Sequence, residues 1–222
     1  MSIKLVLFDL DGTLVNTLAD LCYGVNRELE KYNFPTHKEE AFKYFAGNGI
    51  PKMVERALPS DVSADLKEKI TADFLSYYAD HYCDKSYAYK GTVELAKALK
   101  EKGLLIAVVT NKADEVASLV VNKLFGNIFD FIMGQKKGIP PKPDPTAALL
   151  TMEKLGVKPQ ECVFVGDTGV DVLTGANSGA YPVGVLWGFR EKKELIENGA
   201  KSIIEDPAEL IGIIDNLNGD EK

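Results

Sequence analysis

The sequence has little of several residues on which whole classes of protein depend. Its 222 residues include three cysteines, Cys22, Cys83 and Cys162, with no paired or CxxC spacing, so we expect reduced thiols in a cytoplasmic protein. The two histidines, His37 and His81, lack the spacing of metal ligands. Basic residues are too few to balance the acidic ones. The resulting net charge of -7 gives no electrostatic reason to bind nucleic acid or an anionic membrane.

Long apolar runs and nucleotide-binding loops are also missing. The apolar run at residues 3–8 is interrupted by Asp9 and Asp11, so we expect neither a signal peptide nor a membrane span. There is no GxxxxGK[ST] loop and no strand-linked GxGxxG, so a nucleotide cofactor is not indicated. The composition is otherwise that of an ordinary globular protein with enough residues to bury a sizeable core.

The most informative segment that is present lies at the beginning of the chain. A short apolar run without alternation predicts a strand buried on both faces, as in a parallel sheet. It ends in Asp9 and Asp11, one residue apart, followed by Gly12 and Thr13. Open α/β sheets bind ligands where their strands end, so this placement predicts two acids at a ligand-binding edge.

Beyond this strand the apolar pattern changes character twice. Helical spacing alone is found from residue 17 to about 84, with predicted helices at 18–29, after Thr36 to 45, at 52–58 and from 61 to about 82. Thr36 and Glu39 have the spacing of a capping box for the second of these. From Gly91 onward, helices alternate with strands. The predicted strands are 104–110, 129–133, 162–165 and 183–186, and the predicted helices are 93–102, 114–124, 146–155, 170–178 and two weaker ones near residues 195 and 210.

This order predicts an α/β fold with a doubly wound, mainly parallel, Rossmann-like sheet and helices on both faces. The first strand belongs with the sheet, so the helical block is an insertion after strand one. We expect an α/β core made of residues 1–16 and 85–222, and a small all-helical cap domain made of residues 17–84.

Polar residues follow the predicted strands at one edge of the sheet. Thr110 and Asn111 follow one strand, while Asp167, with Asp171 one helical turn later, follows another. A proline-rich loop carries Lys142 between them. Each residue alone could be a helix cap or a turn residue, but their convergence on one edge favours an active site.

These residues resemble four ordered motifs of the haloacid dehalogenase-like hydrolase superfamily, and the resemblance covers essentially the whole chain. The motifs are Asp9-Leu10-Asp11-Gly12-Thr13, Thr110-Asn111, Lys142 and Gly166-Asp167-Thr168-Gly169-Val170-Asp171. Gly47-Asn48-Gly49 before a helix and the sequence from Phe164 to Thr168 look most like the phosphoglycolate phosphatase branch. Asn16 departs from the acid that many relatives carry in the hinge.

The resemblance implies a phosphatase acting on a small phosphorylated metabolite. Asp9 would be the nucleophile that forms an aspartyl phosphate, and Asp11 the acid and then the base. Thr110, Asn111 and Lys142, with Gly12 and Thr13 beside them, would bind the phosphoryl group. Asp9, Asp11, Asp167 and Asp171 would hold a metal, and all-oxygen ligation beside a phosphate indicates Mg²⁺.

The cap offers a candidate for recognition of the rest of the substrate. Gly47-Asn48-Gly49 precedes a helix whose Lys52 and Arg56 lie one turn apart on one face. Either this basic pair is the solvated face of the helix, or it receives a small carboxylate such as that of phosphoglycolate.

Several alternatives remain open. A phosphosugar mutase or an inorganic pyrophosphatase would use the same Asp pair, and a non-catalytic binding protein could descend from the same fold. A receiver-type signalling module is disfavoured because Gly134 and Gln135, and no acceptor Asp, follow the strand that ends at Met133. We expect no nucleic acid or membrane partner, and a monomer or homodimer.

Overall fold

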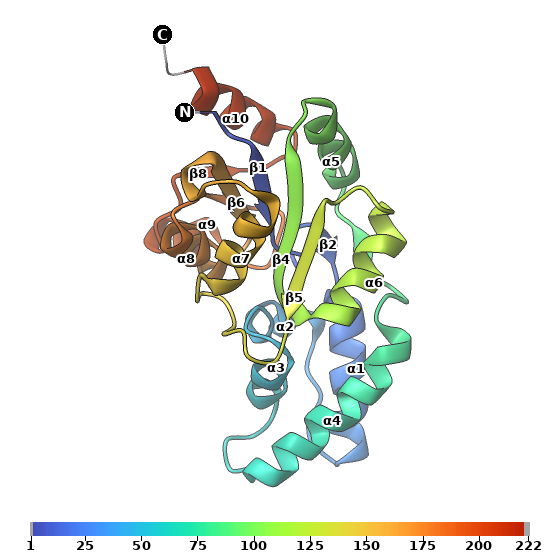
Figure 1. Ribbon diagram of the computed structural model, residues 1–222. Coiled ribbons are helices and arrows are strands. Elements are labelled where there is room, and N and C mark those ends of the chain that lie inside the picture. The colour runs from blue at the N-terminus through green and yellow to red at the C-terminus, as the bar shows by residue number, and fades with distance from the viewer. Residues whose placement is uncertain (1, 220–222) are drawn as a thin grey trace.

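The structure is a computed structural model that describes residues 2–219. Its main element is a six-stranded parallel sheet in the order β5-β4-β1-β6-β7-β8 (Figure 1). The strands are β1 (Leu5–Phe8), β4 (Leu105–Ala113), β5 (Phe131–Gln135), β6 (Cys162–Gly166), β7 (Tyr181–Val185) and β8 (Ser202–Ile204). The predicted α/β class and doubly wound sheet are confirmed.

Helices cover both faces of this sheet, which explains the continuous apolar run of β1. Val6 and Phe8 pack with helices α5, α6 and α10, whereas Leu5 and Leu7 pack on the opposite face with α7. Because both faces are covered, neither set of alternate side chains can be polar. The helices of the core are α5 (Thr92–Glu101), α6 (Asp114–Phe125), α7 (Thr146–Leu155), α8 (Gly169–Ser178), α9 (Lys192–Glu197) and α10 (Glu209–Gly219), with a 3-10 turn at Pro159–Glu161.

The helical insertion forms a second lobe beyond the carboxyl ends of the strands (Figure 1). It contains α1 (Leu18–Lys31), α2 (Glu39–Phe45), α3 (Ile50–Ala57) and α4 (Ala64–His81). These helices bury their own apolar cluster, which includes Val25, Phe42, Met53 and Phe74. The insertion therefore has its own core, and its division from the rest at residues 16/17 and 84/85 stays a prediction.

Two short strands join this lobe to the sheet domain. β2 (Val15–Asn16) pairs antiparallel with β3 (Tyr87–Ala88). Buried Asp20 at the start of α1 accepts hydrogen bonds from the backbone N–H groups of Lys85 and Ser86. The outgoing and returning segments are thus tied to each other.

Some local expectations differ from the structure. Helix α2 begins at Glu39 after Lys38, with no side-chain cap, so the capping box predicted from Thr36 is wrong. Helix α4 begins after Ser63, whose hydroxyl accepts from Leu66 N–H at 3.4 Å, later than the predicted start. Strands β2, β3 and β8 were not predicted, because each has too few residues to show a pattern.

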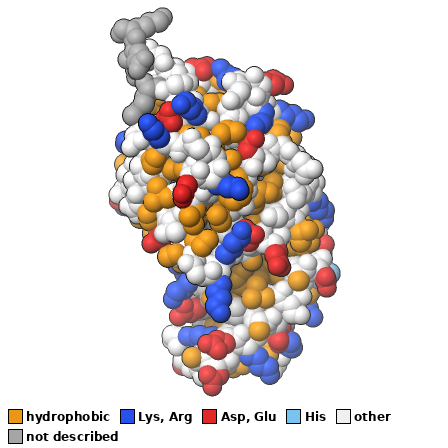
Figure 2. Space-filling model, viewed as in Figure 1, with side chains coloured by type: hydrophobic (Ala, Val, Ile, Leu, Met, Phe, Trp, Pro, Cys, Tyr) orange, Lys and Arg blue, Asp and Glu red, His pale blue; other side chains and the backbone are white. Residues whose placement is uncertain are grey.

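Charged side chains of both signs lie on the surface. Figure 2 shows basic and acidic side chains interspersed over the face in view. Between residues 2 and 219, no helix combines the length and the apolar character that a membrane crossing requires.

Candidate active site

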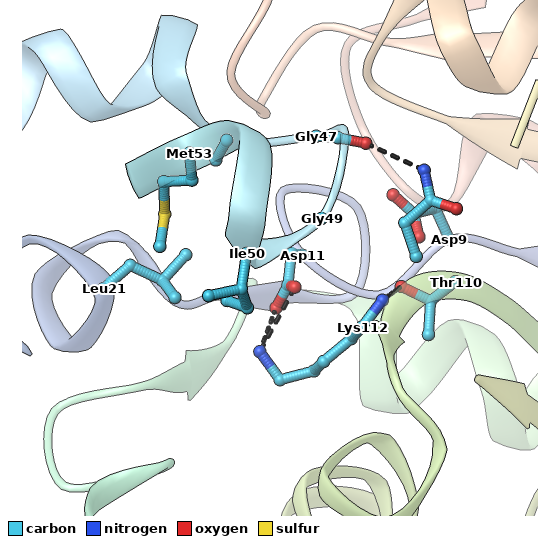
Figure 3. Close-up of a pocket in the computed structure, with 11 residues that line it drawn as sticks. Asp9, Asp11, Leu21, Gly47, Gly49, Ile50, Met53, Thr110 and Lys112 are labelled. Carbon is cyan, nitrogen blue, oxygen red and sulfur yellow. Dashed lines mark hydrogen bonds and ion pairs between the residues drawn. The ribbon is translucent and has the colours of Figure 1, made fainter. Parts of the chain in front are cut away.

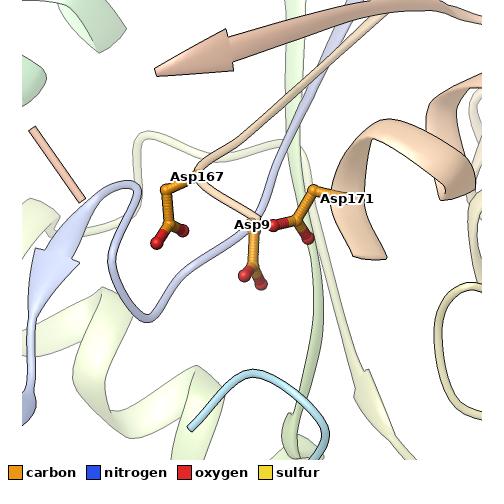
Figure 4. A group of neighbouring side chains, drawn as sticks. All are labelled: Asp9, Asp167 and Asp171. Atoms are coloured by element: carbon orange, nitrogen blue, oxygen red, sulfur yellow. The ribbon is translucent and has the colours of Figure 1, made fainter. Parts of the chain in front are cut away.

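Three buried carboxylates meet at the carboxyl edge of the sheet. Asp9 follows β1, Asp167 follows β6 and Asp171 lies in the first turn of α8 (Figure 4). Each offers one oxygen, and these three oxygens lie within 4.8 Å of one another. The structure therefore brings together residues that are up to 162 positions apart, and it does so because β1 and β6 are neighbouring parallel strands.

Glycines make room for this cluster. Gly12 has φ +91°, and a Cβ atom there would lie 2.3 Å from an Asp167 carboxylate oxygen. A Cβ atom on Gly166 would lie 2.1 Å from the Cβ of Asp171. Any other residue at Gly12 would be strained in its backbone and would displace Asp167. The glycine beside the first acid pair is thus needed for the site rather than only for a turn.

Asp167 is held in a fixed orientation. One carboxylate oxygen accepts from the Thr13 hydroxyl at 2.8 Å, and the other accepts from the Phe189 N–H at 2.8 Å. Burial, with Asp171 and Asp9 adding to it, nevertheless raises its pKa well above the usual range. Gly12 and Thr13, which were predicted to bind substrate, therefore have a structural contact with Asp167.

Asp9 is also in an environment that disfavours its charge. Burial raises its pKa to about 7, against the lowering effect of Lys142 and with a further increase from Asp171 and Asp11. Its Oδ1 atom accepts no hydrogen bond from the described residues, although Lys142 Nζ lies 2.8 Å away. An additional cation at this atom would relieve both features.

Lys142 is the ammonium group that faces the cluster. Its side chain is 2% exposed, and its Nζ lies 2.8 Å from Asp9 Oδ1 and 2.6 Å from Asp171 Oδ1. Burial opposes the charge, but the two carboxylates outweigh it and raise the pKa of Lys142. Its backbone is fixed by Asn111, whose amide accepts from Lys142 N–H at 2.8 Å and donates to its carbonyl at 3.2 Å.

The donor set fits a hard divalent cation. The converging atoms are all carboxylate oxygens. The Oδ1 atom of Asp9 is buried without a hydrogen bond in the described part of the chain. Oxygen-only ligation of this kind suits Mg²⁺. Asp9, Asp167 and Asp171 are the residues that would hold it.

The side chain of Asp11 lies outside this carboxylate cluster. Its two oxygens accept from Lys112 Nζ at 3.0 and 3.2 Å. The same Nζ donates to the hydroxyl of Tyr78, a buried residue of α4, at 2.9 Å. Metal ligation by the Asp11 side chain is therefore not supported by this geometry. Its position suits proton transfer beside the pocket instead.

A pocket separates this edge of the sheet from the helical lobe (Figure 3). Its volume is about 30 Å³. Asp9, Asp11, Thr110, Asn111 and Lys112 line it from the sheet side, and Leu21, Ala46, Gly47, Gly49, Ile50 and Met53 line it from the helical side. Asn111 donates to the Gly47 carbonyl at 3.1 Å and so connects the two sides.

The predicted basic pair of the cap does not reach this pocket. Lys52 is exposed and lies 2.6 Å from Glu55. Arg56 donates to the Phe45 carbonyl at 2.9 Å and to the Asn48 side chain at 2.7 Å, and so fixes the loop before α3. Of the loop residues predicted to bind substrate, Gly47 and Gly49 line the pocket, whereas Asn48 does not.

Two site residues were not assigned a role from the sequence. Lys112 follows Thr110 and Asn111 directly, so its place at the edge was visible, but its partner Asp11 is distant in the chain. Tyr78 has the spacing of an ordinary core aromatic residue, and no sequence signal distinguishes it.

The fold and the buried acids define a Rossmann-like α/β protein with an acidic site between a parallel sheet and an inserted helical lobe. Residues 6–185 match the haloacid dehalogenase-like hydrolase family. The chain belongs to this family, as its motifs predicted. The match covers β1 through β7 and hence every residue of the site.

Individual relatives agree with this assignment. The phosphoglycolate phosphatase of Haemophilus influenzae is 34% identical over 220 residues, covering 95% of this chain and 98% of that protein. The enzyme of the same name from Pseudomonas putida is 32% identical, over 97% and 82% of the two chains. A solved structure from Lactobacillus delbrueckii subsp. bulgaricus has a TM-score of 0.91 at 32% identity and covers 99% and 100% of the two chains. The prediction of a phosphatase in the phosphoglycolate phosphatase-like branch is confirmed.

Proposed function

We propose that this enzyme is a Mg²⁺-dependent phosphatase that hydrolyses a small phosphate monoester, with phosphoglycolate as the preferred substrate. The single observation that carries the proposal is the position of Asp9. It ends β1 inside a cluster of buried carboxylates, 2.8 Å from Lys142 and at the wall of the pocket. A carboxylate in that place can attack a phosphoryl group bound beside it.

The reaction needs two steps and one proton carrier. In the first step an Asp9 oxygen forms a bond to phosphorus, and the bond from phosphorus to the ester oxygen breaks, while protonated Asp11 supplies a proton to the leaving oxygen. In the second step water attacks phosphorus and Asp11 takes the proton from that water, while the bond between the Asp9 oxygen and phosphorus breaks, which releases inorganic phosphate and regenerates the Asp9 carboxylate. Asp11 lines the same pocket as Asp9, which supports this division of work.

The other residues of the edge serve charge and position. Lys142 neutralises negative charge on the phosphoryl oxygens, and Thr110 lines the pocket where those oxygens would lie. Asn111 uses its amide to hold Lys142 and the Gly47 loop, so we assign it a positioning role beside the phosphoryl group. Mg²⁺ held by Asp9, Asp167 and Asp171 would compensate the carboxylate charges and polarise the phosphoryl oxygens.

The substrate assignment is supported by the names of the relatives. The pocket is small, with a volume of about 30 Å³, and it lies between the sheet edge and the helical lobe. We infer that the helical lobe moves away from the sheet about the β2–β3 connection to admit the substrate. Such a lobe favours small esters, because a large leaving group would prevent closure. A cytoplasmic location and a monomeric or dimeric state stay predictions.

The decisive experiment is release of inorganic phosphate from a panel of esters with Mg²⁺ present. We expect the highest kcat/KM with phosphoglycolate, and lower values with hexose phosphates, pyrophosphate and p-nitrophenyl phosphate. A mutase would interconvert a phosphosugar with little net phosphate release. A non-catalytic descendant of the fold would turn over none of the panel.

A further inference from the structure

A buried lysine beside the proposed acid has no role in the chemistry described so far. The side chain of Lys112 is 2% exposed and enters the pocket from β4 (Figure 3). Among the described residues that line the pocket, it is the only lysine or arginine. Burying an ammonium group is unfavourable unless partners compensate its charge. A cation kept in such a place needs an explanation beyond packing.

The contacts of Lys112 fix its position between the two sides of the pocket. Its Nζ donates to Asp11 from the sheet side and to the Tyr78 hydroxyl from α4 at 2.9 Å. It also lies 4.9 Å from the centre of the Tyr78 ring. Tyr78 is itself buried, so the ammonium is held by the helical lobe as well as by the core.

The position coincides with the place where the rest of a short substrate must lie. Asp11 must reach the leaving oxygen, and in phosphoglycolate the carboxylate is separated from that oxygen by one carbon. Lys112 Nζ is 3.0 Å from Asp11 Oδ1. It is therefore within reach of a carboxylate that lies one carbon away from a leaving oxygen beside Asp11. The helical lobe faces the same space with Leu21, Ile50 and Met53, which cannot compensate a negative charge.

We propose that Lys112 is the residue that recognises the carboxylate of the substrate, with Tyr78 holding its ammonium group in place. This inference rests on the proposed phosphatase function. It names the side chain that makes the enzyme prefer a leaving group that carries a carboxylate. On substrate binding Lys112 exchanges part of its contact with Asp11 for the substrate carboxylate.

The test compares two substrates that differ only in that charge. Phosphoglycolate and 2-hydroxyethyl phosphate have the same chain length, but the second has a neutral hydroxymethyl group in place of the carboxylate. In Lys112→Met we expect kcat/KM for phosphoglycolate to fall roughly 10- to 100-fold, mostly through KM, because one charged hydrogen bond is lost. The value for 2-hydroxyethyl phosphate should change less than threefold. Lys154→Met, at an exposed position of α7, is the matched control and should leave both unchanged.

Each outcome decides the matter. An equal loss with both substrates would show that Lys112 only positions Asp11, and would overturn the proposal. A wild-type enzyme with no preference for phosphoglycolate would instead refute the proposed substrate. If Lys112→Met does not fold, Tyr78→Phe decides, since it keeps the lysine but removes its hydroxyl partner. It should raise KM for phosphoglycolate several-fold and leave KM for the neutral ester unchanged, and equal effects on both would contradict the proposal.

Discussion

Replacement of Lys142 by methionine should destabilise the metal-free protein strongly. The ammonium lies within 2.8 Å of both Asp9 and Asp171, and its side chain is 2% exposed. Removing one partner of a buried ion pair leaves an uncompensated charge, which costs about 3–5 kcal/mol of unfolding free energy. For a protein of this size that corresponds to a fall in Tm of about 6–20 °C.

The size of this loss depends on pH in a direction that the structure sets. Burial raises the pKa of Asp9 to about 7 even with Lys142 present. At pH 5 the Asp9 carboxylate is protonated in the folded protein, so Asp9 adds no uncompensated charge when Lys142 is removed. At pH 8 the Asp9 carboxyl group of the variant is either ionised without its ammonium partner or protonated at a pH where it would be ionised in water. Either state is unfavourable. The destabilisation should therefore be larger at pH 8 than at pH 5.

The assay is thermal unfolding with a chelator at both pH values, followed by titration with Mg²⁺. Mg²⁺ should stabilise the variant by about 2.7 kcal/mol at a hundredfold excess over its Kd, while activity stays low because the phosphoryl group has lost its ammonium partner. Lys136→Met is the control, since Lys136 forms an exposed pair with Asp114 at 3.2 Å. Such a pair contributes about 0–1 kcal/mol. A Lys142→Met protein that unfolds at the wild-type Tm in chelator at pH 8 would refute the argument.

Four further predictions follow from the same site. Asp9→Asn should abolish phosphate release yet leave the Tm at pH 8 unchanged or higher, because a buried carboxylate with a raised pKa is removed; near-wild-type turnover would sink the nucleophile assignment. Asp11→Asn should slow esters of alcohols much more than p-nitrophenyl phosphate, which needs no proton, and equal slowing would count against the acid role. Chelation should abolish turnover, with Mg²⁺ restoring it and Ca²⁺ inhibiting; full activity after exhaustive chelation would exclude the metal. Because the raised pKa of Asp9 means that the folded state binds more protons, wild-type metal-free stability should fall by up to about 1.4 kcal/mol per pH unit between pH 4 and 7, and a stability that rises in this window would contradict it.

The elements that position the site were predictable because their signals are local. The α7 helix was predicted at residues 146–155, and it is observed at Thr146–Leu155, between a proline and a glycine that stop the pattern at each end. Strand β6 was predicted to within one residue from its continuous apolar run. Parallel order then required the acids after β1 and β6 to meet, and they do.

The direction of individual side chains could not be predicted in this way. Lys52 and Arg56 do share a face of α3, but helical spacing does not say which face meets the pocket, and the structure turns them elsewhere. The pairing of Lys112 with Asp11 joins residues 101 positions apart, which depends on how β1 and β4 align. Strand register, and not any local motif, decides that contact.

The same reasoning indicates why two buried lysines occur in a protein of net charge -7. An acidic chain repels an anionic substrate at long range, so attraction must come from groups inside the site, where the lower dielectric strengthens it. Lys142 contacts Asp9 and Asp171, and Lys112 contacts Asp11. Each lysine is held by carboxylates. In the substrate complex these carboxylates would release the lysine or also bind a metal cation. Under the proposed function, the free site keeps its two ammonium groups compensated by carboxylates, and a substrate with a phosphoryl group and a separate carboxylate would replace contacts of both lysines, whereas an ester without the carboxylate would replace those of one.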